Sequence, residues 1–153
     1  MRTTARVFVA LWYLLGWLFH VYLALSSPTT YAVFGETGFL PGFPDFWRNT
    51  VMPNIVLLAL LLAGFELTVG ILLISRDPFV KPGLVLSLAF NLFLIQMGLG
   101  FPAADATQDI VANRLPNLMF VAIQVPLLWG TYKESLVTLI RRRFGVVQAK
   151  SAG

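Results

Sequence analysis

Five polar side chains in otherwise apolar stretches are the residues of this sequence best suited to chemistry. They are Glu66, His20, Asn91, Gln96 and Gln124. An ionisable side chain inside a membrane is costly and by default indicates a functional site. We interpret the five as an intramembrane polar pocket that holds a ligand head group or a proton. The alternative is that they hydrogen-bond one another and only fix the packing of helices.

Other kinds of site are missing from the sequence. It contains no nucleophile elbow, glycine-rich phosphate loop or carboxylate cluster, so we predict no catalytic group and no metal site. The absence of cysteine excludes disulfides, Cys-ligated zinc and iron–sulfur clusters. His20 is the only histidine, and a single ligand is more typical of a packed side chain than of a metal site. We expect no covalently bound cofactor, and a quinone or a lipid as the occupant of the pocket.

The composition predicts a membrane protein. Of the 153 residues, 58% are hydrophobic and only 12% are charged, whereas soluble domains carry about 25% charged residues. So few charges cannot cover a surface that faces water, so the lipid bilayer is the first expected partner. The net charge of +4 does not indicate nucleic acid, because the basic residues lie at the ends of the apolar runs.

The apolar runs predict an all-α membrane protein, a four-helix up-down bundle that forms one domain over residues 1–153. Each run approaches the roughly 20 residues that cross a bilayer. The first also resembles a signal peptide, but its length and its aromatic residues favour a retained helix. The four transmembrane helices are expected at about 7–26, 53–74, 84–101 and 115–132.

The segments between and after these helices have distinct compositions. Residues 27–50 are rich in Gly, Pro and aromatic side chains, which predicts an interfacial cap between the first two helices. Residues 133–144 predict a basic amphipathic segment at the membrane surface, and residues 145–153 a disordered tail.

Depth along the helices suggests which polar residues meet. Glu66 lies 13 residues after Pro53, or roughly 20 Å along a helix. Counting in the same way places Asn91 and Gln124 at a similar depth. His20 and Gln96 are expected to form a second layer. The glycines that flank Glu66, Gly64 and Gly70, are typical of close helix approach.

The distribution of Lys and Arg predicts the topology. Nine of these residues fall on one side of the predicted bundle, and only Arg48 and Arg114 on the other. Because cytoplasmic segments carry the excess of positive charge, both termini are expected in the cytoplasm. The predicted location is the inner (plasma) membrane, crossed several times.

The arrangement resembles the DoxX-like family of four-helix membrane proteins. The resemblance covers about residues 8–130 and rests on two segments: YAVFGETGFLPGFP, and FELTVGILLISRDPFVKPGLVLSLAFNLFL. It implies a membrane subunit of a quinone-reducing oxidoreductase, as some members are, with Glu66 and Gly70 as the best-matched positions. The family's histidine late in helix one is matched only approximately by His20, and its histidine in helix three is absent.

Three functions follow as hypotheses. The preferred one is a small subunit of a larger membrane complex that anchors other membrane proteins and shapes a quinone or lipid pocket; such a subunit is not catalytic alone. The second is a quinone-linked oxidoreductase subunit in which Glu66 and His20 handle protons. The third is a small carrier that binds a lipid or solute at the midplane.

Overall fold

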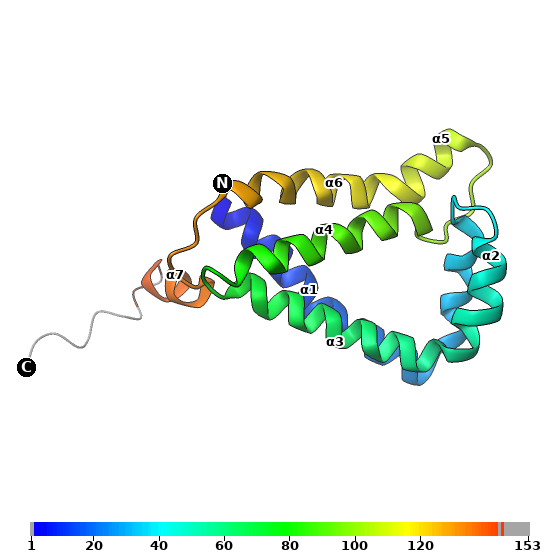
Figure 1. Cartoon of the computed structure of the whole chain (residues 1–153), viewed down its shortest axis with the longest axis horizontal. Helices are drawn as coiled ribbons and strands as arrows, with labels where there is room; N and C mark the ends of the chain where they lie inside the picture. Colours follow the sequence, from blue (N-terminus) through cyan, green and yellow to red (C-terminus); the bar gives the residue numbers. More distant parts are fainter. Residues whose placement is uncertain (1, 144, 146–153) are drawn as a thin grey trace, which may run out of the picture.

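The computed structural model describes residues 2–143 and 145, and every regular element among them is helical (Figure 1). Four helical runs are long and apolar enough to cross a membrane: Arg2–Ser26, Phe43–Ile74, Val80–Met97 and Ala106–Trp129. The prediction of an all-α protein with four membrane-spanning segments is therefore confirmed at this level. The predicted tail lies, apart from residue 145, outside the described residues.

The bundle is built from α1 (Arg2–Ser26), α3 (Ile55–Ile74), α4 (Val80–Met97) and α6 (Leu115–Gln124), which continues as a 3₁₀ turn, η5 (Val125–Trp129). α1 packs along α3, α3 packs on α4, and α4 packs on α6. In Figure 1, α1 runs diagonally from a start beside α6 to the far end of α3. The α1–α3 pair therefore diverges from the α4–α6 pair toward one end of the molecule.

The third and fourth apolar helices begin earlier than the sequence predicts. α4 begins at Val80 instead of residue 84, because Pro82 is tolerated in a first helical turn. It ends at Met97, where Gly98 takes a φ of 83°. The predicted loop before the fourth helix is itself helical: α5 (Ala106–Asp109) and the π-helical η4 (Ile110–Arg114) lead into α6. The Asp105 side chain caps α5 by accepting a hydrogen bond from the Gln108 amide at 2.8 Å.

A helical cap crosses the end at which the two helix pairs diverge, which we call the cap end. It consists of η1 (Pro28–Thr37), α2 (Phe43–Phe46), η2 (Trp47–Val51) and η3 (Met52–Asn54). Figure 1 shows the α2 segment nearly perpendicular to α3, with the bend just before α3 begins. Thus the apolar run from Phe43 to Ile74 is one helical stretch with two directions.

The opposite end, which we call the basic end, contains the start of α1, the loop 75–79 and α7 (Leu136–Arg143). Arg6 closes it from inside. Its Nε donates to the Leu73 carbonyl at 2.7 Å, another guanidinium nitrogen donates to the Ser75 carbonyl, and the group lies 4.7 Å from the centroid of the Tyr132 ring. Burial raises the pKa of Tyr132, so its phenol stays neutral beside this arginine.

Large apolar side chains cover the outside of the long helices. Trp12 on α1, Leu61 on α3, Leu92 on α4 and Met119 on α6 are each about 60% exposed. Patches of this extent are unusual on a soluble monomer and are the expected surface of helices in lipid. The fold therefore supports contact with a bilayer on all four helices.

Candidate functional site

A cavity of about 690 Å³ lies between α1, α3, α4 and the cap. Its walls are aromatic and aliphatic side chains from these elements, among them Trp12, Phe19, Phe34, Trp47, Leu62, Phe90, Phe93 and Leu94. α6 contributes no residue to this lining. The cavity therefore occupies the space left where α1 leaves α6 and crosses to α3.

The cavity has an apolar mouth on the outside of the bundle. Trp12, Leu15 and Phe19 on α1 line the cavity and are 58%, 61% and 58% exposed. Phe93 on α4 also lines it and is 44% exposed. Side chains that are both lining and exposed mark an opening, and on a membrane-spanning helix that opening faces lipid.

One corner of the cavity is polar and joins α1, α3 and the cap. The Glu66 carboxyl on α3 is 4% exposed, and its Oε1 lies 3.5 Å from His20 Nε2 on α1. The other ring nitrogen, Nδ1, lies 2.7 Å from the Tyr31 hydroxyl on η1. Trp47 Nε1 donates to the Tyr31 carbonyl at 2.9 Å, which fixes the cap residue in place. The side chains of Glu66, His20 and Tyr31 thus form a continuous series of contacts from the middle of α3 to the cap.

Tyr31 is a neutral hydrogen-bonding partner in this corner. Burial, and to a smaller extent the nearby Glu66 carboxyl, raise the pKa of Tyr31 to about 12. The phenol therefore keeps its proton at physiological pH. It can donate to His20 or accept from it, depending on which ring nitrogen carries hydrogen.

A second polar cluster joins α1, α4 and α6. Asn91 Nδ2 donates to the Tyr13 hydroxyl at 3.0 Å and to the Ser87 carbonyl at 2.8 Å. Ser87 Oγ lies 2.9 Å from the same hydroxyl and donates to Gln124 Oε1. Tyr13 and Asn91 line the cavity, whereas Ser87 and Gln124 lie behind them, fully buried.

The structure brings together three of the five predicted pocket residues. Glu66, His20 and Asn91 line the cavity. Gln124 is one hydrogen bond behind it, through Ser87. Gln96 does not line it: its carbonyl accepts from the Phe39 amide at 3.0 Å at the cap end.

The predicted layers therefore differ from the contacts. The sequence predicts His20 beside Gln96 and Asn91 beside Glu66. In the structure His20 contacts Glu66, and Asn91 contacts Tyr13. Counting residues from each helix start treats the helices as parallel, but α1 crosses the bundle diagonally (Figure 1). Because α4 begins at Val80 and not at residue 84, every depth counted from its predicted start is wrong by four residues, or about 6 Å.

Two further polar residues were not foreseen as part of this site. Tyr31 lies in a segment whose aromatic content indicated only an interfacial cap, and Ser87 is a common small residue of membrane helices. The sequence does contain one signal for Tyr31. It lies in a Gly- and Pro-rich segment, and such a segment is expected to fold back onto the helix ends. Nothing in the spacing of Ser87 points to Gln124.

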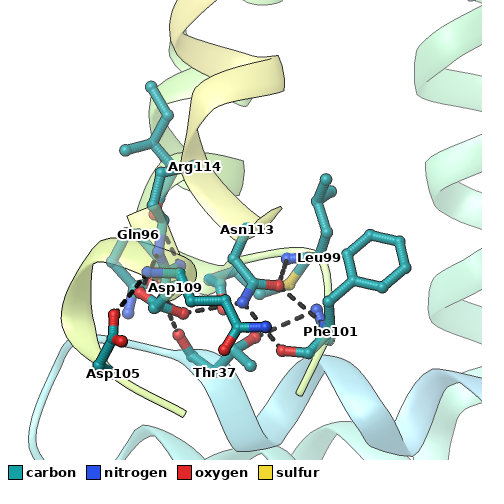
Figure 2. Close-up of polar contacts among 12 residues, drawn as sticks. Thr37, Gln96, Leu99, Phe101, Asp105, Asp109, Asn113 and Arg114 are labelled. Atoms are coloured by element: carbon teal, nitrogen blue, oxygen red, sulfur yellow. Dashed lines mark hydrogen bonds and ion pairs between the residues drawn. The ribbon is translucent and has the colours of Figure 1, made fainter. Parts of the chain in front are cut away.

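A cluster around Arg114 holds the cap end together (Figure 2). The guanidinium donates to the carbonyls of Ile95, at 2.8 Å, and of Thr37, and forms an ion pair with Asp109 at 3.2 Å. It also lies 3.9 Å from the centroid of the Phe39 ring. A buried arginine thereby connects the C-terminal end of α4, the α5–η4 segment and the end of η1. The same η1 carries Tyr31 into the cavity.

Gly98 makes room for this cluster. A Cβ at position 98 would lie 2.6 Å from an Arg114 nitrogen, and the φ of 83° also favours glycine. Asn113, which is fully buried, accepts from the Leu99 and Phe101 amides at 3.2 and 2.8 Å. The turn after α4 therefore contacts Arg114 at Gly98 and is hydrogen-bonded to Asn113 at Leu99 and Phe101.

The cavity has the composition of a small-molecule binding site. Within residues 2–143 and 145, no three His, Cys, Asp or Glu side chains gather as a metal site would require. The cavity offers apolar walls, flat aromatic surfaces and a small number of polar groups, which is the usual make-up of a ligand site.

No family model matches this chain, and the searches of curated proteins and of solved structures find no match. The resemblance to the DoxX-like family therefore stays a prediction, supported at the level of four long apolar helices.

Proposed function

We propose that this protein is a small integral membrane subunit that binds an apolar, bilayer-dissolved molecule with a polar head, of the quinone or lipid type. The observation that carries the proposal is the cavity that opens toward lipid and ends at Glu66, His20 and Tyr31. Its volume of about 690 Å³ lies within the range of small-molecule sites, about 300–1,000 Å³.

The two ends of the cavity match the two ends of such a molecule. An isoprenoid or acyl tail would lie along Trp12, Leu15 and Phe93 at the mouth. A ring or head group would reach the polar corner, where side chains from α1, α3 and η1 converge. Phe90 and Trp47 offer the flat surfaces against which a ring stacks.

Within this proposal, the quinone-linked role depends on a partner. The sequence has no cysteine to hold a thiolate-bound redox centre. Electrons would therefore reach a bound quinone from another subunit, while Glu66 and His20 exchange protons with it. This is the role that the DoxX-like resemblance implies. A carrier function would use the same cavity without electron transfer.

Filling the cavity from α3 tests the proposal. Leu62 lines the cavity and its neighbour Leu61 is 60% exposed on the outer face, so Leu62→Trp and Leu61→Trp are a matched pair. We expect Leu62→Trp to weaken binding of an isoprenoid benzoquinone, in nanodiscs, by about tenfold or more, because the indole takes the ligand's place. Leu61→Trp should bind as the wild type does.

Binding is measured by quenching of tryptophan fluorescence, and each variant's melting temperature checks that it is folded. Equal binding by both folded variants would contradict the proposed site. Purification from the native membrane in mild detergent tests the subunit role: other chains should co-purify, and a protein recovered alone would contradict it.

A further inference from the structure

The Glu66 carboxyl has too few hydrogen-bond donors for a group buried this deeply. Oε1 has only the contact with His20 Nε2, at 3.5 Å, and Oε2 is buried without a partner. The residue is 4% exposed, so the group is nearly closed off from bulk solvent. An unpaired acceptor of this kind is costly in a protein interior and more so for a charged group.

The neighbouring protein groups cannot correct this imbalance in the arrangement observed. Tyr31 and His20 are engaged with each other at 2.7 Å. Trp47 Nε1 donates to a backbone carbonyl, and Asn91 Nδ2 donates to Tyr13 and to a backbone carbonyl. With Glu66 ionised, the corner therefore lacks a donor, and an acceptor-only head group would leave the carboxylate oxygen unpaired.

Gly16 allows α1 to pack closely beside this carboxyl. It lines the cavity on α1, opposite Glu66, and a Cβ at this position would lie 2.9 Å from Oε2. Any larger residue would press its side chain against the oxygen. The missing side chain thus leaves just enough room for Oε2 beside α1, while Glu66 as a residue lines the cavity.

We propose that the occupant's head group carries a hydroxyl that donates a hydrogen bond to Glu66, as in an isoprenoid alcohol or the reduced, hydroquinone form of a quinone. The inference rests on the proposed function and narrows its ligand class. It applies to the ionised carboxylate, whose two oxygens only accept; a protonated Glu66 would donate its own hydrogen, and an ether with the same tail would then bind as tightly as the alcohol. A hydroxyl brings one donor, whereas an ammonium brings three and would leave some unpaired among apolar walls.

A matched pair of probes tests this inference. Farnesol and farnesyl methyl ether share the same tail and differ in whether the head oxygen carries a proton. We expect the wild-type protein in nanodiscs to bind farnesol at least about tenfold more tightly than farnesyl methyl ether. Affinities are expressed per mole fraction of probe in the bilayer, and empty nanodiscs serve as the blank.

Two variants on α3 locate the effect. Glu66→Gln replaces an oxygen acceptor with an amide donor at the same volume, so the preference for the alcohol should fall to about threefold or less. Thr68→Val is the control, because Thr68 is exposed on the outer face of the same helix and donates only to the Gly64 carbonyl. It should keep the full preference.

The outcomes separate the two proposals. If the wild type binds the ether as tightly as the alcohol, the hydroxyl inference is wrong while the cavity remains a binding site. If neither probe binds, and neither competes with the isoprenoid benzoquinone, both proposals fail. Should Glu66→Gln not fold, the ratio of the two probes on the wild type still decides the inference.

Discussion

Arg114 brings three separate segments of the chain around one guanidinium group. Its side chain is 3% exposed, and its hydrogen bonds go to the carbonyls of Ile95, Gln96 and Thr37 as well as to Asp109 (Figure 2). The planar group can satisfy these acceptors at once because its five N–H groups point in fixed, different directions. In the sequence Arg114 served only to count positive charges for the topology prediction. In the structure it is a buried arginine that links three segments of the chain.

Replacing Arg114 with Lys tests this role. The ammonium keeps the charge but cannot reach the same acceptors or stack on Phe39. We expect Arg114→Lys to lower the free energy of unfolding by about 2 kcal/mol and the melting temperature in detergent by about 5 °C.

The control for this substitution is Arg48→Lys at the same end of the molecule. Arg48 is 65% exposed and lies 3.9 Å from each of its two carboxylate neighbours. Exposed pairs of this kind contribute roughly 0–1 kcal/mol. Equal melting temperatures for the two variants would show that the Arg114 cluster does not stabilise the cap.

At the scale of elements, the close packing of α1 on α3 positions Glu66 and His20 within reach of each other. Gly70 on α3 allows this approach. A Cβ at position 70 would lie 2.7 Å from the Leu14 side chain and 3.1 Å from its backbone nitrogen. Gly64, which the sequence also assigned to close approach, has no heavy atom within 4 Å of an added Cβ, so for it that interpretation is wrong.

The two glycines give a matched pair of substitutions on one helix. Gly70→Ala must push the helices apart, so we expect a loss of about 1–3 kcal/mol in the free energy of unfolding. Gly64→Ala should leave it unchanged or raise it by up to about 1 kcal/mol, because alanine favours the helix. Thermal unfolding in one detergent, followed by circular dichroism, compares the two.

The opposite order, with Gly64→Ala the more damaging, would mean that α3 presents another face to α1. Gly70→Ala should also weaken ligand binding, since His20 would be moved away from Glu66. Gly64→Ala should not.

The elements could be predicted from the sequence, whereas the contacts in the site could be predicted only in part. Length and apolar composition alone decide that four segments cross a membrane. Glu66 stands out because an acid in such a segment is costly. The pairing of Glu66 with His20 depends on the tilt of α1, and tilt is set by packing that no single segment encodes.

At the scale of the whole molecule, basic residues are concentrated at one end. The basic end contains Arg2, Lys81, Lys133 and Arg142, whereas the cap end contains Arg48 and Arg114. The positive-inside rule then predicts that the basic end is cytoplasmic and the cap faces the opposite side of the membrane.

Single cysteines test this orientation, and the natural chain has none to interfere. Thr29 in the cap and Thr131 near the basic end are both exposed. We expect a membrane-impermeant maleimide added to intact cells to label Thr29→Cys and to label Thr131→Cys only after lysis. The reverse pattern would invert the topology.

The apolar mouth formed by Trp12, Leu15 and Phe19 would connect the proposed site to the bilayer and not to water. A molecule that enters through this mouth comes from the hydrocarbon core of the membrane, where partitioning has already concentrated it. Occupancy then follows the ratio of that molecule to phospholipid, and it changes little with the volume of surrounding water. Diluting the membrane with inert lipid should therefore empty the protein, while diluting the cell suspension with buffer should leave it loaded.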